Sequence, residues 1–223
     1  MILFAGPLSL FSRKVEIALA EKGLPYERVM VPFSQTEGYS PKHPAVVAAN
    51  PKGQVPVLVD GDLTLYDSTL IMEYLEDAYP VPALFPKSPK ARALCRLLEL
   101  EADEVLLNPV RKLMHRSEPP GANTAQKEEG AIHAEREIAS NYGKVAAKLG
   151  HQEFLCGEFS VADIATFMTI HHGLRLNAPL LTKTENLAAW YERLKARPSI
   201  AKVVSEMAEA DAILSHPMPK RST

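Results

Sequence analysis

The chain has 223 residues, of which 46% are hydrophobic and 23% are charged, and its formal net charge is -2. This length allows one large core or two modest ones, and the charge excludes a broad basic face for nucleic acid. The two cysteines form no C-x-x-C pair, which excludes a disulfide framework and a cysteine-based zinc site. No apolar run approaches the ~20 residues of a membrane span, and the start lacks a basic secretory signal. We therefore expect a cytoplasmic protein with no metal, nucleic-acid partner or membrane partner.

The first 79 residues alternate short strands with helices. Strands are expected where compact apolar runs end at turn residues, namely 2–5, 26–31, 55–60 and 63–67. Helices are expected at 11–23, around 44–50 and at 67–79. In the first helix Val15, Ala18 and Leu19 share a buried face, and the side chains expected outside are Arg13, Lys14, Glu21 and Lys22. The predicted order is β-α-β-α-β-β-α.

Residues 80–89 carry four prolines in ten positions, so they cannot continue a helix and are expected to form a linker. Everything after this linker has a helical pattern. Asn108-Pro109 interrupts the amphipathic segment 90–117, and a kink or a restarted helix is expected there. Ser160-x-x-Asp163 is a helix-capping signature, so we expect Asp163 to be structural. The predicted domains are 1–79, the linker 80–89 and an all-helical domain 90–223.

Several motifs carry a resemblance to a known family. They are "SLFSRKVEIALAEKGLPYE", "NPKGQVPVLVDG", "LYDSTLIMEYLEDAYP", "FSVADIA" and "NLAAWYERLKARPS". In this order and spacing they resemble the cytosolic glutathione S-transferases, of a bacterial, serine-bearing type. The resemblance implies an α/β plus all-α fold, in which a thioredoxin-like βαβαββα domain precedes an all-helical domain. It also implies glutathione as co-substrate, a role in detoxification of a small electrophile or a peroxide, and a homodimer.

Val55-Pro56 stands at the start of an apolar strand, where proline cannot donate a ladder hydrogen bond. In the family this proline is cis, and the cysteinyl unit of glutathione pairs with the residue before it. The resemblance therefore implies a cis Val55-Pro56 bond, with the N–H and C=O of Val55 available to a peptide laid antiparallel beside it. An ordinary trans proline at a strand start is the alternative.

Asp67-Ser68 opens the third predicted helix, where unpaired N–H groups and the helix dipole attract a carboxylate. Ser68 can donate to that carboxylate, and Asp67 can accept from an ammonium group, so the pair suits a γ-glutamyl group. The family uses this pair in that way, although either residue can also cap the helix. By the same resemblance Gln54 and Lys42 match positions near the glycyl end, and a plain surface lysine is the alternative for Lys42.

Ser9 and Ser12 lie in the turn from the first strand to the first helix. A hydroxyl donor and a helix N-terminus aimed at a thiol favour its thiolate, which is scarce near neutrality because a free thiol has a pKa of about 8.5. By resemblance Ser9 matches the activating serine, and Ser12 would face the same end of the helix. For Ser9 the alternative is a helix N-cap alone. Serine at this position disfavours a mixed-disulfide mechanism.

The electrophile is expected between the domains, beside the long helix that carries Arg111 and His115. A cationic wall there would attract an acidic co-substrate, whereas a solvated helix face is the alternative. Two further functions are considered. One is glutathione-dependent isomerisation of an unsaturated dicarboxylate, which "SLFS" disfavours because it lacks the serine-cysteine signature. The other is a non-catalytic interaction protein, because "LTLYDSTLIMEYLEDAYPVPALFP" also resembles the stringent starvation proteins, which bind RNA polymerase.

Overall fold

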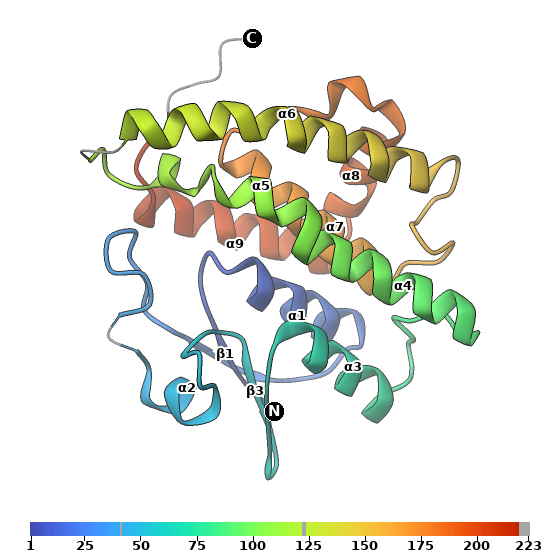
Figure 1. Ribbon diagram of the computed structural model, residues 1–223. Coiled ribbons are helices and arrows are strands. Elements are labelled where there is room, and N and C mark those ends of the chain that lie inside the picture. The colour runs from blue at the N-terminus through green and yellow to red at the C-terminus, as the bar shows by residue number, and fades with distance from the viewer. Residues whose placement is uncertain (41, 122–123, 219–223) are drawn as a thin grey trace. The chain divides into compact units, whose positions relative to one another are not determined.

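The computed structural model describes residues 1–40, 42–121 and 124–218 (Figure 1). It combines a thioredoxin-like N-terminal sheet domain with a helical C-terminal domain, as predicted. Within the described ranges, no helix has both the length and the apolar character needed to cross a membrane.

The chain divides into two compact units. The first contains Met1–Leu84 and Pro198–Ser215, and the second contains Phe85–Arg197 and the described residues from His216 on. The last long helix thus shares a unit with the N-terminal sheet. The predicted division into 1–79, 80–89 and 90–223 remains a proposal about the independently folding parts.

A four-stranded mixed sheet forms the centre of the first unit. Its strands are β1 (Ile2–Ala5), β2 (Glu27–Met30), β3 (Val57–Asp60) and β4 (Leu63–Tyr66). Their spatial order is β2-β1-β3-β4, and only the β1–β2 pair is parallel. A helix connects the two parallel strands, whereas the two-residue turn at Gly61 suffices for the antiparallel β3–β4 hairpin.

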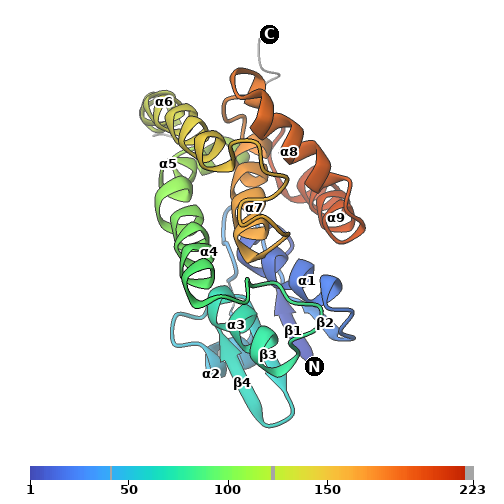
Figure 2. The ribbon, with the colours of Figure 1, turned by 90° about the vertical axis from the view of Figure 1, so that its right-hand side faces the viewer.

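Helices cover both faces of this sheet (Figure 2). The helices on the two faces are α1 (Leu10–Glu21), α2 (Pro44–Ala49) and α3 (Ser68–Ala78), and α9 (Pro198–Leu214) packs against α1. Side chains alternate along β1, so Phe4 packs with Val46 of α2 in one apolar cluster. The neighbours Leu3 and Ala5 are fully buried on the opposite face, where α1 and α3 pack against each other.

Three of the charged side chains that the sequence places outside the first helix are buried, which corrects that prediction. Arg13, Lys14 and Lys22 are each 6% exposed or less. Each has a partner that offsets the cost of burying a charge. The Nζ of Lys22 donates to Glu76, at 2.8 Å, and to two backbone carbonyls, while the Nζ of Lys14 lies 5.6 Å from the centre of the Phe11 ring. Helical periodicity could not reveal these partners, because most are distant in sequence.

The second unit is helical. Its α-helices are α4 (Pro89–Glu101), α5 (Leu107–Arg111), α6 (Thr124–Leu149), α7 (Val161–Arg175) and α8 (Glu185–Lys195). Shorter 3₁₀ turns occupy Met114–Ser117 and Leu181–Lys183. A π-helical turn, Ala102–Leu106, separates α4 from α5, and the restart at Leu107 agrees with the interruption predicted at Asn108-Pro109. Pro109 has no N–H for the preceding turn, and Asn108 donates its side-chain amide to the Glu104 carbonyl instead.

The buried helix α7 organises the second unit through the predicted cap. The carboxylate of Asp163 is fully buried and accepts four hydrogen bonds. Two come from the backbone N–H and hydroxyl of Ser160, at 3.1 and 3.0 Å. The others come from the Leu155 N–H at 2.9 Å and the Trp190 indole at 3.0 Å. One side chain therefore joins the start of α7 to the preceding loop and to α8.

We expect Asp163→Ala to lower the free energy of unfolding by about 3 kcal/mol, because it leaves several buried donors without an acceptor. Urea denaturation followed by circular dichroism measures the change. Glu192→Ala, at an exposed position on α8, is the control and should change stability by less than about 0.5 kcal/mol. Equal stability of the two variants would show that Asp163 is not structural.

Candidate functional site

Strand register brings three predicted site segments to one end of the sheet. Val57 pairs with Phe4 of β1 and with Tyr66 of β4, both in antiparallel fashion. The chain leaves β1 toward Ser9, enters β3 through Val55 and leaves β4 toward Asp67. All three segments therefore adjoin the same sheet end, where α1 and α3 also begin.

Ser9 is the N-cap of α1. Its Oγ accepts a hydrogen bond from the Ser12 N–H at 3.3 Å, and its own N–H donates to the Gly6 carbonyl at 3.2 Å. The side chain is only partly buried. Because the oxygen accepts from the helix, the hydroxyl hydrogen is directed elsewhere, and the helix N-terminus adds positive potential. Ser9 is thus a hydrogen-bond donor at the positive end of a helix.

Ser12 has a different environment. Its side chain is fully buried, and its Oγ accepts a hydrogen bond from the Gly6 N–H at 3.1 Å. The buried Ser12 hydroxyl therefore supports the Gly6–Ser9 turn. Its expected part in thiol activation stays a prediction.

The Val55–Pro56 peptide bond is cis, which confirms the prediction for this bond. The ladder of β3 begins at Val57, so Val55 precedes the paired part of the strand. Both Val55 and Pro56 are buried as whole residues, with Val55 9% exposed. The apolar side chain of Val55 belongs to the cluster formed with Phe4 and Val57.

Asp67 and Ser68 form the start of α3. Asp67 caps the helix, because its Oδ1 accepts from the Thr69 N–H at 3.0 Å and from the Leu70 N–H at 3.4 Å. Its φ of 77° lies in the left-handed region, which is uncommon for a residue other than glycine and often marks a functional site. Ser68 is the first helical residue and is 4% exposed. The capping role predicted as an alternative for Asp67 is therefore present.

Lys42 lies beside the loop that leads to Val55. A Cβ atom built on Gly53 would lie 3.3 Å from the Lys42 Cδ, so the lysine stem crosses the Gly53 backbone. Gly53 has a φ of 59°, which favours glycine in its own right. The next residue, Gln54, is exposed, and its carbonyl accepts from the Asn50 side chain at 2.8 Å. Lys42 and Gln54 thus belong to one loop cluster.

The two residues predicted for the electrophile pocket have different environments in the second unit. Arg111 is exposed, whereas His115 is 9% exposed and lines a cavity of about 400 Å³ that does not include Arg111. The two ring nitrogens of His115 contact the Lys112 carbonyl at 3.0 Å and the Glu128 carboxylate at 2.9 Å. They therefore do not form a joint cationic wall in this cavity.

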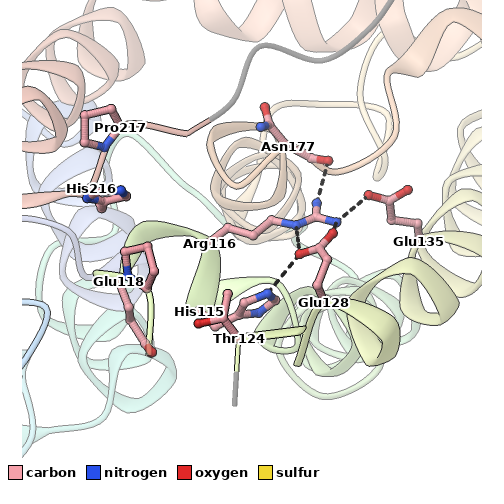
Figure 3. Close-up of a pocket in the computed structure, with 10 residues that line it drawn as sticks. His115, Arg116, Glu118, Thr124, Glu128, Glu135, Asn177, His216 and Pro217 are labelled. Carbon is pink, nitrogen blue, oxygen red and sulfur yellow. Dashed lines mark hydrogen bonds and ion pairs between the residues drawn. The ribbon is translucent and has the colours of Figure 1, made fainter. Parts of the chain in front are cut away.

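The charged groups of this cavity are largely paired with one another (Figure 3). Arg116 donates to both oxygens of Glu128, at 3.1 and 2.6 Å, and to the Leu176 and Asn177 carbonyls. Glu135 lies 2.9 Å from the same guanidinium. The hydrogen bond from Arg116 holds the pKa of Glu128 below its ordinary value. This network joins α6 to the end of α7. Across the described residues, no group of three or more His, Cys, Asp or Glu side chains is arranged to hold a metal.

Sequence reasoning missed three residues around the Ser9 turn. Tyr39 lies against Gly6, because a Cβ at Gly6 would be only 2.0 Å from the tyrosine oxygen. Arg13 binds the Pro7 carbonyl, and Glu206 binds Arg13. No local motif signals these contacts. Only the glycine itself hinted that another group approaches the backbone closely.

Family models for two adjoining domains match this chain. The glutathione S-transferase N-terminal domain matches residues 3–83, and the glutathione S-transferase C-terminal domain matches residues 79–198. The chain belongs to the glutathione S-transferase family. The sheet end formed by Ser9, Val55 and Asp67 lies entirely within the N-terminal match of this glutathione S-transferase family member.

Similar proteins are of two kinds. A stringent starvation protein A homolog from Coxiella burnetii is 36% identical over 127 residues, which cover 57% of this chain and 57% of that protein. Glutathione S-transferase 2 from Saccharomyces cerevisiae is 28% identical and covers 92% of this chain and 89% of its own. A glutathione S-transferase from Methylobacterium radiotolerans, crystallised with glutathione sulfonate, has a TM-score of 0.74 and 27% identity over 100% of this chain and 99% of its own.

Proposed function

We propose that this protein is a glutathione S-transferase that binds glutathione at the sheet end of the first unit and activates its thiol. The observation that carries the proposal is the register that gathers Ser9, Val55 and Ser68 at that end. There the N-termini of two helices lie beside Val55, which precedes the paired part of β3. A tripeptide with a thiol and two carboxylates matches these three features.

Each part of glutathione has a proposed partner. The cysteinyl backbone pairs antiparallel with Val55, which precedes the ladder of β3. The γ-glutamyl carboxylate accepts from the N–H and hydroxyl of Ser68, at the start of α3. The γ-glutamyl ammonium faces Asp67, and the glycyl carboxylate faces Lys42 and Gln54. The complex of the Methylobacterium relative with glutathione sulfonate supports glutathione as the ligand.

Ser9 supplies the chemistry in this proposal. Its hydroxyl donates to the glutathione sulfur, and the N-terminus of α1 adds favourable potential, so the thiol pKa falls. The thiolate then attacks an electrophilic carbon and forms a carbon–sulfur bond while a leaving group departs. With a peroxide it attacks one oxygen, the O–O bond breaks to release an alcohol or water, and a second glutathione converts the resulting sulfenic acid to glutathione disulfide and water. Positioning and ionising the nucleophile are the main tasks of such an enzyme.

Three further attributes belong to the same proposal. The electrophile binds near Arg111 and His115. Because Arg111 is exposed and His115 is buried, the two side chains do not line one shared surface. The physiological role is detoxification, and the location is the cytoplasm. Residues 9–12 read "SLFS" and contain no cysteine, which disfavours a glutathione-dependent isomerase.

A non-catalytic regulatory protein is the second candidate. It is favoured by the similarity to the stringent starvation protein A homolog of Coxiella burnetii, which has a higher identity than the yeast transferase over a shorter stretch. Saturable glutathione binding separates the two candidates. Binding with a lowered thiol pKa supports the enzyme, and its absence at millimolar glutathione supports the regulatory protein.

We expect Ser9→Ala and Ser68→Ala to affect different steps. Ser9→Ala should raise the pKa of bound glutathione by about one unit and lower conjugation of an aryl halide about tenfold, with binding nearly unchanged. Ser68→Ala should weaken binding about tenfold, because it removes a hydrogen bond to a carboxylate, and leave the thiol pKa unchanged. Calorimetry measures binding, and thiolate absorbance against pH measures the pKa.

Ser205→Ala is the matched control, because Ser205 is exposed on α9 and its hydroxyl donates to Glu209 at 3.4 Å, outside the candidate site. This variant should behave as the wild type in both measurements. If Ser9→Ala leaves thiol pKa and turnover unchanged, Ser9 has no part in the mechanism.

We also propose that the protein is a homodimer that buries one face of α4. Four apolar side chains on α4 and the π-helical turn are 48–53% exposed, and they are Leu94, Leu97, Leu100 and Val105. The opposite face packs into the unit through Cys95 and Leu106. An apolar row of this kind is costly to leave in water, and a second copy of the chain would cover it.

We expect Leu97→Glu to shift the protein from dimer to monomer, because it introduces a charge into the apolar contact. Sedimentation velocity measures the mass, and circular dichroism verifies that the variant is folded. Ile213→Glu is the control, because Ile213 is 82% exposed on α9 and should leave the mass unchanged. A folded Leu97→Glu variant with the same mass as the wild type would exclude this face of α4.

A further inference from the structure

The turn that presents Ser9 is held by a buried arginine. The Nη2 atom of Arg13 donates to the Pro7 carbonyl at 3.0 Å, two residues before Ser9. Ser12 also holds this turn, because its Oγ accepts a hydrogen bond from the Gly6 N–H. Arg13 itself is 1% exposed. The position of Ser9 therefore depends on where this guanidinium lies.

Acidic groups from two elements fix that guanidinium. The Nη1 atom of Arg13 lies 2.5 Å from the Glu16 carboxylate on α1 and 2.9 Å from the Glu206 carboxylate on α9. Arg28 of β2 also binds Glu206 and lies 3.6 Å from Glu16. Two cations and two anions thus form one cluster that connects α9, the sheet and the Ser9 turn within the first unit.

The cluster keeps Glu206 ionised. Burial acts to raise the pKa of Glu206, but hydrogen bonding from Arg28 and the charges of Arg28 and Arg13 outweigh it and lower that pKa. An ionised Glu206 attracts Arg13 more strongly than a neutral amide would, and a partly buried pair is weakly screened by salt. Glu206 can therefore restrain the guanidinium, although 193 residues separate it from Arg13.

We propose that Arg13 is a positioning residue for Ser9 and that Glu206 of α9 holds Arg13 in place. Arg13 touches no substrate in this proposal and acts only through the Pro7 carbonyl. Its effect on the glutathione thiol rests on the proposed function of Ser9, whereas its effect on the turn does not. A displacement of the Ser9 hydroxyl by less than 1 Å would already weaken its hydrogen bond to a bound sulfur.

The test uses Glu206→Gln, which preserves size and removes the charge. The first readout is amide hydrogen exchange of Ser9 in the protein without glutathione, because the Ser9 N–H bonds to the Gly6 carbonyl within the turn. The second readout is the thiol pKa of bound glutathione. Glu209→Gln, at an exposed position one turn further on α9, is the matched control. Arg13→Lys tests whether a positive charge alone can hold the turn, because a lysine ammonium lacks the planar guanidinium that donates to several acceptors at once.

We expect Glu206→Gln to accelerate exchange of the Ser9 amide about tenfold, while the Leu58 amide of β3 exchanges as in the wild type. The thiol pKa should rise by about half a unit, with glutathione affinity changed less than twofold, and Glu209→Gln should change neither quantity. Arg13→Lys should show the same changes as Glu206→Gln, because a lysine cannot bind Pro7 and both acids at once.

Unchanged Ser9 exchange in Glu206→Gln would overturn the proposal, whether or not glutathione binds. Equal acceleration at Ser9 and Leu58 would also overturn it, because it would reflect a general loss of stability. If the wild type lowers the thiol pKa and Glu206→Gln lowers it equally, Arg13 does not position Ser9 for catalysis. If the wild type binds no glutathione but Glu206→Gln still accelerates exchange of the Ser9 amide, the role of Glu206 and Arg13 in holding the turn is supported. The proposed glutathione S-transferase function then fails.

Discussion

Two antiparallel pairings, Val57 with Phe4 and Val57 with Tyr66, determine where the candidate residues of the first unit lie. A slip of one residue would turn every side chain of β3 to the other face and move Val55 away from the turn after β1. The apolar cluster of Phe4, Val46 and Val57 opposes such a slip, because these side chains would leave the core. The position of the site is thus a consequence of core packing.

The chemistry of this sheet end comes from backbone groups as much as from side chains. Helices α1 and α3 both begin there, and each presents N–H groups that favour an anion. The Asp67 carboxylate accepts from two of these N–H groups, those of Thr69 and Leu70. The proposed carboxylate site is therefore at Ser68, in the first turn of α3. In the second unit, by contrast, Arg116 donates to Glu128 and to two backbone carbonyls, so its guanidinium holds α6 to the end of α7.

Most elements followed from sequence, because strands and helices leave local signals. The run at residues 2–5 ends at Gly6-Pro7, the hairpin turns at Gly61, and Ser160-x-x-Asp163 marks the start of α7. The candidate site followed from a resemblance, since composition alone does not reveal a cis Val55–Pro56 bond. The burial of Arg13 and Lys22 could not be predicted from the sequence. Helical periodicity predicts that a charged side chain is exposed, and the partners that allow its burial are distant in sequence. The burial of Ser12 was also not predicted, because no local pattern shows that its hydroxyl accepts from the Gly6 N–H.

The placement of glutathione in the first unit is the claim on which the proposed chemistry depends. A crystal structure of the protein with glutathione tests it most directly. We expect the cysteinyl backbone to pair with Val55, the γ-glutamyl carboxylate to lie within about 3 Å of the Ser68 N–H, and the sulfur to lie within about 3.5 Å of the Ser9 oxygen. Glutathione bound elsewhere, or with its sulfur beyond hydrogen-bonding distance of Ser9, would contradict the claim.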